Sequence, residues 1–330
     1  MRTSLSELLA TGRVLLADGA TGTNYMMNGL GPGEPPEFWV TDRPDDVMSL
    51  HQQFVEAGAD IILTNTFGCN PHRLKLHNAQ ARTYELAKGA AVLARRVADA
   101  APRPVVVAGS VGPTGELFEP MGALNHADAV ASFADEIRGL RDGGADVAWI
   151  ETMSSPEEVH AAVTAAIEGG MPYVVTCSYD TAGRTMMGLM PGAMADTLAD
   201  EPVEPLAMGA NCGVGASDIL VTLLEMSGAP YPLVSKGNCG VPHFVGTEIV
   251  YTGTPELMAK YATMAIDAGV RIVGGCCGTS PEHLASMRAA IDSYSPGERP
   301  TMAAIVEHIG VLTNSAPAET TGRSTRRSRG

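Results

Sequence analysis

The stretch DRPDDVMSLHQQFVEAGADIILTN, residues 42–65, shows the unit from which this chain is built. An early Pro44 and apolar residues at helical spacing predict a helix that ends at Gly58. A short apolar run rich in β-branched residues, DIILTN, follows and predicts a strand. This run does not alternate between apolar and polar residues, which is typical of a strand buried on both faces, as in a parallel sheet.

Eight such runs occur, each followed by a turn and then by a helical pattern. The runs are Val14–Asp18, Asp60–Asn65, Pro104–Gly109, Asp146–Glu151, Tyr173–Ser178, Ala207–Cys212, Pro232–Asn238 and Arg271–Cys276. The helical patterns are Asp42–Gly58, Ala81–Ala101, His126–Gly143, Ser155–Gly169, Ala216–Gly228 and Thr254–Gly269, and Thr279–Glu282 begins a final helix. This alternation predicts one α/β domain over residues 1–313, a (β/α)8 TIM barrel. A doubly wound sheet is the alternative, but only a closed barrel brings all the strand ends together.

Composition and charge narrow the class of protein. The chain has 330 residues, of which 45% are hydrophobic, and a formal net charge of −15, which disfavours binding to nucleic acid and anionic membranes. It contains no apolar run near the roughly 18 residues of a membrane-spanning helix and no signal-peptide pattern at its start. We therefore expect a cytoplasmic protein. Residues 314–330 are rich in arginine and lack apolar periodicity, so we predict a disordered tail.

Three cysteines lie at predicted strand ends. Cys212 ends the sixth run, Cys276 ends the eighth and Cys277 follows it directly, between flexible glycines. The carboxyl ends of barrel strands share one rim, so these thiols are expected to converge. Zn²⁺ favours thiolates, and catalytic zinc sites keep three protein ligands and one open position. The spacing therefore predicts a zinc site.

The other three cysteines have weaker contexts. Cys69 and Cys177 are predicted to be packing residues. Cys239 follows the seventh run and is a candidate for a fourth ligand, which would make the zinc purely structural.

A three-thiolate zinc site carries a net charge of −1, which suits activation of a thiol better than activation of water. The natural reaction is alkyl transfer to sulfur. Asp18 and Glu151, at the ends of the first and fourth runs, are candidates to bind a cationic amine on the thiol substrate. Helix capping or a structural ion pair is the alternative role for each.

Six motifs resemble the homocysteine-binding methyltransferase barrels. They are DGATGT at Asp18–Thr23, EAGADIILTNTF at Glu56–Phe67, GSVGP at Gly109–Pro113, the strand end at Glu151, NC at Asn211–Cys212 and GGCCGTSPEHL at Gly274–Leu284. The resemblance covers about residues 10–293. It implies Zn²⁺ on Cys212, Cys276 and Cys277, with the homocysteine sulfur as a further ligand. It also implies an amino group held by Asp18 and Glu151 and a carboxylate received by the backbone amides of Gly19 and Ala20.

The methyl donor is less constrained. No cobalamin module follows the barrel and no D-x-H-x-x-G element is found, which favours a small onium donor. Trp39 falls where the betaine enzymes carry an aromatic donor-site residue and could face a quaternary ammonium; packing is the alternative. Gly68 and Thr152 replace tyrosines of the vertebrate betaine enzymes, and Gly68 suggests a looser pocket. The overall similarity is to bacterial proteins of the betaine–homocysteine type.

The sequence thus predicts zinc-dependent methyl transfer from a small onium donor, betaine first, to homocysteine, giving methionine. S-methylmethionine, dimethylsulfoniopropionate and a separate methyl-corrinoid protein are alternative donors. A non-catalytic thiol-binding subunit of a corrinoid complex is the alternative from another class. Homo-oligomerisation stays open.

Overall fold

The computed structural model describes residues 2–240, 242–245, 248–295 and 297–313, so the predicted tail at 314–330 lies outside the described residues. Eight parallel strands form one sheet in the order β1-β10-β7-β6-β5-β4-β3-β2. Their bounds are β1 (Leu15–Leu16), β2 (Ile61–Leu63), β3 (Val106–Val111), β4 (Val147–Met153), β5 (Tyr173–Cys177), β6 (Ala207–Cys212), β7 (Leu233–Gly237) and β10 (Val270–Gly275). A parallel bridge between Ala17 and Ile61 joins the two outermost strands. The predicted TIM barrel is confirmed.

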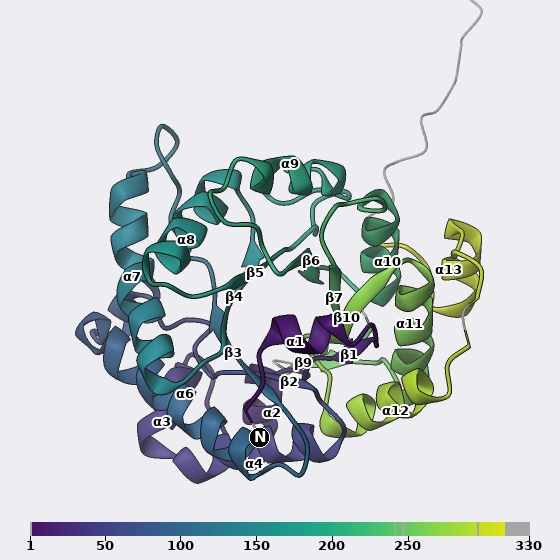
Figure 1. Ribbon diagram of the computed structural model, residues 1–330, viewed down its shortest axis with the longest axis horizontal. Coiled ribbons are helices and arrows are strands. Elements are labelled where there is room, and N and C mark those ends of the chain that lie inside the picture. The colour runs from purple at the N-terminus through teal and green to yellow at the C-terminus, as the bar shows by residue number, and fades with distance from the viewer. Residues whose placement is uncertain (1, 241, 246–247, 296, 314–330) are drawn as a thin grey trace, which may run out of the picture.

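Helices surround the strands (Figure 1). The predicted ones are α4 (Pro44–Glu56), α6 (Thr83–Ala100), α7 (His126–Gly143), α8 (Pro156–Glu168), α10 (Ala216–Glu225), α11 (Pro255–Asp267) and α12 (Pro281–Asp292). The residues that begin two of the predicted helical patterns cap their helices. Ser155 accepts a hydrogen bond from the Glu158 amide at 3.2 Å, and Thr254 accepts one from the Leu257 amide at 3.2 Å.

Shorter elements lie in the connections. They are α1 (Leu5–Ala10), α2 (Gly22–Met27), α3 (Trp39–Asp42), α5 (Pro71–Leu74), α9 (Met194–Ala199), α13 (Met302–His308), the 3₁₀ turns η1 (Pro36–Phe38), η2 (Lys75–His77), η3 (Gln80–Arg82) and η4 (Pro191–Ala193), and an antiparallel hairpin of β8 (Pro242–Val245) and β9 (Glu248–Tyr251). The strand and helix ranges of the sequence analysis do not include them. Elements of three to seven residues are too short to show a clear periodicity.

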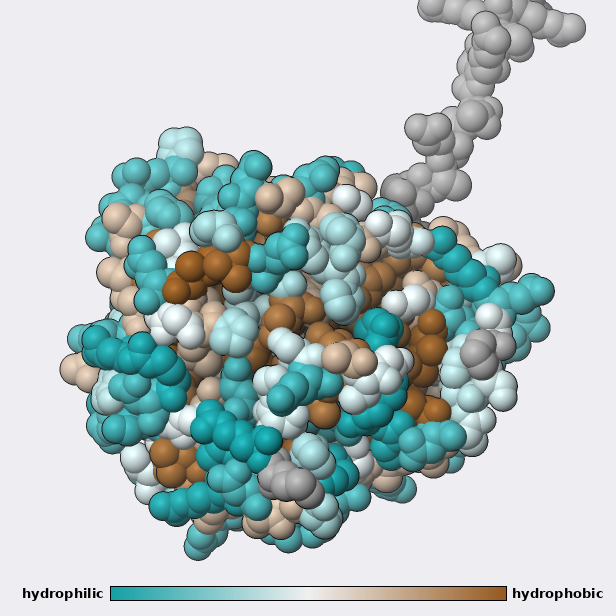
Figure 2. All heavy atoms as spheres, in the orientation of Figure 1, coloured by the Kyte–Doolittle hydropathy of each residue, from teal (hydrophilic) through white to brown (hydrophobic). Residues whose placement is uncertain are grey.

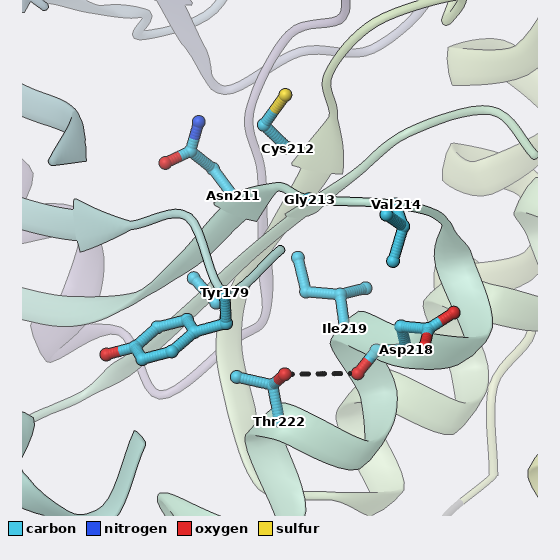
Figure 3. A pocket seen from close by; sticks show the side chains of 9 residues that line it. Tyr179, Asn211, Cys212, Gly213, Val214, Asp218, Ile219 and Thr222 are labelled. Atoms are coloured by element: carbon cyan, nitrogen blue, oxygen red, sulfur yellow. Dashed lines mark hydrogen bonds between the residues drawn. The ribbon is translucent and has the colours of Figure 1, made fainter. Parts of the chain in front are cut away.

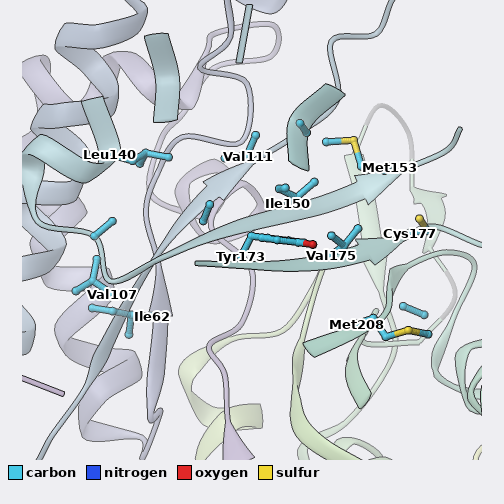
Figure 4. Packing of buried hydrophobic residues seen from close by; sticks show 14 of the residues in the cluster. Ile62, Val107, Val111, Leu140, Ile150, Met153, Tyr173, Val175, Cys177 and Met208 are labelled. Carbon is cyan, nitrogen blue, oxygen red and sulfur yellow. The ribbon is translucent and has the colours of Figure 1, made fainter. Parts of the chain in front are cut away.

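Alternation along the strands divides the core into two layers. One set of side chains fills the barrel, including Leu15, Ile61 and Trp149, and α1 adds Leu5 to it. The other set points outward to the helices; Figure 4 shows part of this layer, with Ile62, Val107, Ile150 and Val175. Successive residues of a strand face opposite sides of the sheet, and both sides are buried here. Every strand therefore needs apolar residues at its odd and at its even positions. This explains the continuous apolar runs of the sequence.

Helix α1 lies across the middle of the barrel in Figure 1, so it covers the amino-terminal end. Figure 2 shows the same face, with hydrophilic residues over most of its rim and hydrophobic residues nearer its middle. Within the described residues, none of the helices combines the length and apolar character that crossing a membrane requires. The opposite end of the barrel, where the strands finish, carries the candidate site.

Candidate metal and thiol site

The three predicted cysteine ligands meet in space. Cys212 ends β6, and Cys276 and Cys277 follow β10 directly. Their sulfur atoms all lie within 4.8 Å of one another. Strand β7 lies between these two strands and holds them in register, since Gly237 pairs with Cys212 on one side and with Gly275 on the other. The cluster is therefore set by the barrel itself.

Asn238, which directly follows β7, fixes the backbone around the cluster. Its side-chain oxygen accepts the Cys277 amide at 3.0 Å, and its amide nitrogen donates to the Gly213 carbonyl at 2.8 Å. The same nitrogen lies 3.7 Å from the Cys212 sulfur. Cys212 has a positive φ of 60°, a strained conformation for a residue with a side chain. One side chain thus joins both strand ends that carry the thiols.

A second asparagine supports Cys212 from the other side. The side-chain oxygen of Asn211 accepts the Thr152 amide at 2.9 Å and the Thr176 hydroxyl at 2.7 Å. Figure 3 shows Asn211 and Cys212 beside a small pocket between β6 and α10. The Cys212 side chain points away from Ile219 and Thr222 in this view, and its sulfur lies within 4.8 Å of those of Cys276 and Cys277.

The chemistry of the cluster fits Zn²⁺. Hydrogen bonds from the thiols of Cys212 and Cys276 hold the pKa of Cys277 well below its ordinary value, so this thiol ionises first. Three sulfur donors leave one tetrahedral position for a substrate. Cys239 is buried, and its thiol donates to the Gly253 carbonyl at 3.3 Å, so the suggested fourth thiolate is engaged elsewhere.

Cys69 and Cys177 are fully buried within the core. Burial raises the pKa of the Cys177 thiol to about 12, as expected for a packing residue. Their predicted role as packing residues is consistent with these positions.

Asp18 forms a buried ion pair, which is the alternative role considered for it, with Lys236, a partner that the sequence analysis did not name. One carboxylate oxygen lies 2.7 Å from the Lys236 ammonium, and the other accepts the Leu63 amide at 2.7 Å. Burial alone would lower the pKa of Lys236, but the charges of Asp18 and Glu151 outweigh it and the pKa is raised. The only sequence signal for this residue is a lysine inside the otherwise buried run PLVSKGN.

Glu151 lies near the same lysine. It accepts a hydrogen bond from the Ser110 hydroxyl at 2.5 Å. Burial raises the pKa of Glu151 to about 7, and the positive charge of Lys236 partly opposes this. With both carboxyls ionised, Asp18, Glu151 and Lys236 carry a net charge of −1. Lys236 pairs in register with Asn211, next to Cys212, and with Gly274, close to Cys276, so the charged group and the thiols belong to one site.

Ala20 does not fit its predicted role. Its amide already donates to the Thr279 carbonyl at 3.0 Å, so this N–H is not free for a substrate carboxylate. Gly19 stays a candidate. A side chain at position 19 would approach the same Thr279 carbonyl to 2.5 Å, which explains why a glycine is needed there.

Trp39 is 5% exposed and packs in the helical layer. The centre of its ring lies 4.7 Å from the centre of the Tyr25 ring. The central carbon of the Arg43 guanidinium lies 3.9 Å from the centre of the Trp39 ring. A cation from the protein therefore already stacks on this ring. The geometry supports the packing alternative and gives no support to a donor-binding role.

Gly68 does not leave an open pocket. Its amide donates to the Glu37 carboxylate at 2.6 Å, and a side chain at position 68 would approach the same oxygen to 2.9 Å. The buried Glu37 thus fills the space that the sequence suggested was loose. Burial raises the pKa of this carboxyl.

Comparison with known proteins identifies the family of this chain. A family model described as homocysteine S-methyltransferase matches residues 15–291. Methionine synthase of Mycobacterium leprae is 32% identical over 315 residues, and that of Mycobacterium tuberculosis is 31% identical over 314. Each alignment covers 90% of this chain but 26% of the relative, so the chain spans about a quarter of their length.

The structural comparison addresses the fold. A crystal structure of the homocysteine methyltransferase MmuM from Escherichia coli, metallated form, superposes with a TM-score of 0.72 at 23% identity. It covers 86% of this chain and 98% of that one. The apo form of the same protein gives a TM-score of 0.67. From the extent of the family match, this chain belongs to the homocysteine S-methyltransferase family.

Proposed function

We propose that this protein transfers a methyl group to the sulfur of homocysteine, giving methionine, and that Cys212, Cys276 and Cys277 hold a catalytic Zn²⁺. The observation that carries the proposal is the convergence of three cysteine sulfurs within 4.8 Å at the carboxyl end of the barrel. Zinc held by three thiolates would favour loss of the substrate thiol proton near neutral pH while leaving the sulfur nucleophilic. Family membership supports homocysteine as the methyl acceptor.

The buried charges beside the cluster would bind the amino group of homocysteine. With both carboxyls ionised, Asp18, Glu151 and Lys236 carry a net charge of −1, which the ammonium of the substrate would neutralise. Both oxygens of Asp18 already have partners, whereas Glu151 has a hydroxyl partner on one oxygen and no cation within ion-pair distance among the described residues. We therefore assign direct contact with the ammonium to Glu151. Asp18 acts mainly by holding Lys236.

The rest of the amino acid would be bound at the rim. The Gly19 amide, in the turn after β1, is the proposed donor to the substrate carboxylate, and Ala20 is excluded by its bond to Thr279. Ser110 orients Glu151 through a hydrogen bond from its hydroxyl. Positioning of this kind matters for methyl transfer, because the attacking sulfur must lie in line with the methyl group and its leaving group.

Betaine is the donor we propose, on the resemblance of the sequence to bacterial proteins of the betaine–homocysteine type. S-methylmethionine and dimethylsulfoniopropionate are the alternatives among small onium compounds. The relatives named methionine synthase support methionine as the product without selecting the donor. Since Trp39 packs against Arg43, the donor site has to be located by other means.

The test is methionine formation by purified zinc-loaded protein. Homocysteine is supplied with betaine, S-methylmethionine or dimethylsulfoniopropionate in parallel, and product is measured by chromatography. We expect turnover with betaine. Turnover with another small donor alone would replace betaine but keep homocysteine methylation. No methionine with any small donor, but methionine with a methylated corrinoid protein, would support the partner-dependent function instead.

A further inference from the structure

The β8–β9 hairpin brings a tyrosine to the cysteine cluster. It lies between β7 and α11 in the chain, and Tyr251 ends β9 opposite Pro242 in the register. Tyr251 is therefore at the base of the hairpin, near the barrel. The sequence analysis assigned no role to this segment.

The base of the hairpin is fastened to the strand ends that carry the thiols. The Cys239 amide donates to the Cys277 carbonyl at 2.9 Å, and the Gly253 amide donates to the Cys239 carbonyl at 3.0 Å. A ring nitrogen of His283, in α12, lies 3.1 Å from the Gly253 carbonyl. Backbone hydrogen bonds before β8 and after β9 thus fix the position of Tyr251 relative to Cys277.

The Tyr251 side chain packs directly on the cluster. A side-chain carbon added at Gly278 would come within 2.4 Å of the Tyr251 ring, so the ring covers the turn that follows Cys277. Gly278 also has a φ of 80°, so this position favours glycine for two separate reasons. The Tyr251 hydroxyl and the Cys277 side chain interact, and the charges of Cys212 and Cys276 also act on this hydroxyl.

We propose that Tyr251 is a positioning residue of the thiol site, whose hydroxyl donates a hydrogen bond to the Cys277 thiolate. The inference rests on the proposed zinc site and deepens it. A hydrogen bond draws electron density from a thiolate, and such outer partners tune a metal centre. Without such hydrogen bonds, three thiolates would donate so much negative charge to the zinc that a fourth thiolate would bind less well. Tyr251 on one sulfur and Asn238 beside another reduce that excess, which favours binding of a fourth, substrate thiolate.

The test compares Tyr251→Phe with a matched control, Tyr84→Phe, after loading with Co²⁺. Tyr84 donates to Asp142 at 3.0 Å on the outer helices, so its loss removes a phenol hydrogen bond remote from the cluster. Tyr251→Phe keeps the ring that covers Gly278. We expect it to retain about one metal per chain, since three thiolates remain. Its sulfur-to-cobalt charge-transfer band should move to lower energy, because the Cys277 sulfur becomes more electron-rich.

Homocysteine affinity, measured by titrating the cobalt spectrum, should fall by about 2- to 12-fold in Tyr251→Phe, the effect of one hydrogen bond. Uniform replacement of tyrosine by 3-fluorotyrosine, which strengthens the phenol as a donor without removing it, should move the wild-type band the opposite way. A band at the wild-type position in Tyr251→Phe overturns the proposal. So does loss of metal, which would make Tyr251 a ligand itself. A wild-type protein that binds no metal contradicts the zinc site rather than the role of Tyr251.

Discussion

Breaking the buried pair of Asp18 and Lys236 should destabilise the barrel strongly. Lys236→Met removes the ammonium that lies 2.7 Å from a carboxylate that is 1% exposed, and leaves that carboxylate with the Leu63 amide. Removing one partner of a buried pair costs about 3–5 kcal/mol, because a charge is left in a site of low polarity. Asp18→Asn combined with Lys236→Met removes both charges and should recover most of the loss.

The measurement is urea unfolding of wild type, both single variants and the double variant, at one saturating zinc concentration, since bound metal adds to the free energy of unfolding. We expect a coupling energy of about 2–3 kcal/mol between the two positions. A loss below about 1 kcal/mol for Lys236→Met, or a double variant whose loss equals the sum of the two single losses, would refute the pair as a structural unit.

Two further variants test the site around this pair. Glu151 has a pKa of about 7, so its carboxyl is mostly neutral below that pH and charged above it. Glu151→Gln should therefore weaken homocysteine binding by about 10- to 100-fold above pH ~8 and little below pH ~6. If the ratio of homocysteine affinities of variant and wild type does not change with pH, the contact is contradicted. The raised pKa also means that the folded protein holds this proton more tightly, so unfolding free energy of metal-free wild type should fall as pH rises from about 4.5 to about 7, a slope that Glu151→Gln should lack. Trp39→Ala should cost about 3–5 kcal/mol of stability, from its buried ring, while the more conservative Trp39→Phe should leave the KM for betaine unchanged. A raised KM in Trp39→Phe at unaltered stability would return Trp39 to the donor site.

The barrel was predictable because its signal is repeated. Each strand must be apolar on both faces, and a run such as DIILTN next to a capped amphipathic helix satisfies both requirements locally. The cysteine cluster followed from topology, since strands β6 and β10 end at the same rim. Neither inference needed the position of any side chain.

Contacts between distant residues were not predictable in the same way. Lys236 meets Asp18 across a sequence separation of 218 residues, and nothing near either residue indicates the other. The amide of Ala20 was expected to be free, but its bond to Thr279 closes the turn after β1 onto the turn after β10. The structure gives no support to Trp39 and Gly68 as donor-site signals, because Arg43 stacks on the Trp39 ring and Glu37 lies beside Gly68.

The most direct test of the central claim is zinc content together with methionine formation in single cysteine variants. Wild type should hold about one Zn²⁺ per chain, and Cys276→Ser should lose metal and activity together. Cys239→Ser is the matched control, because a serine hydroxyl can still donate to the Gly253 carbonyl and Cys239 stands outside the cluster. It should keep both zinc and turnover. Full zinc and full turnover in Cys276→Ser would contradict the three-cysteine site.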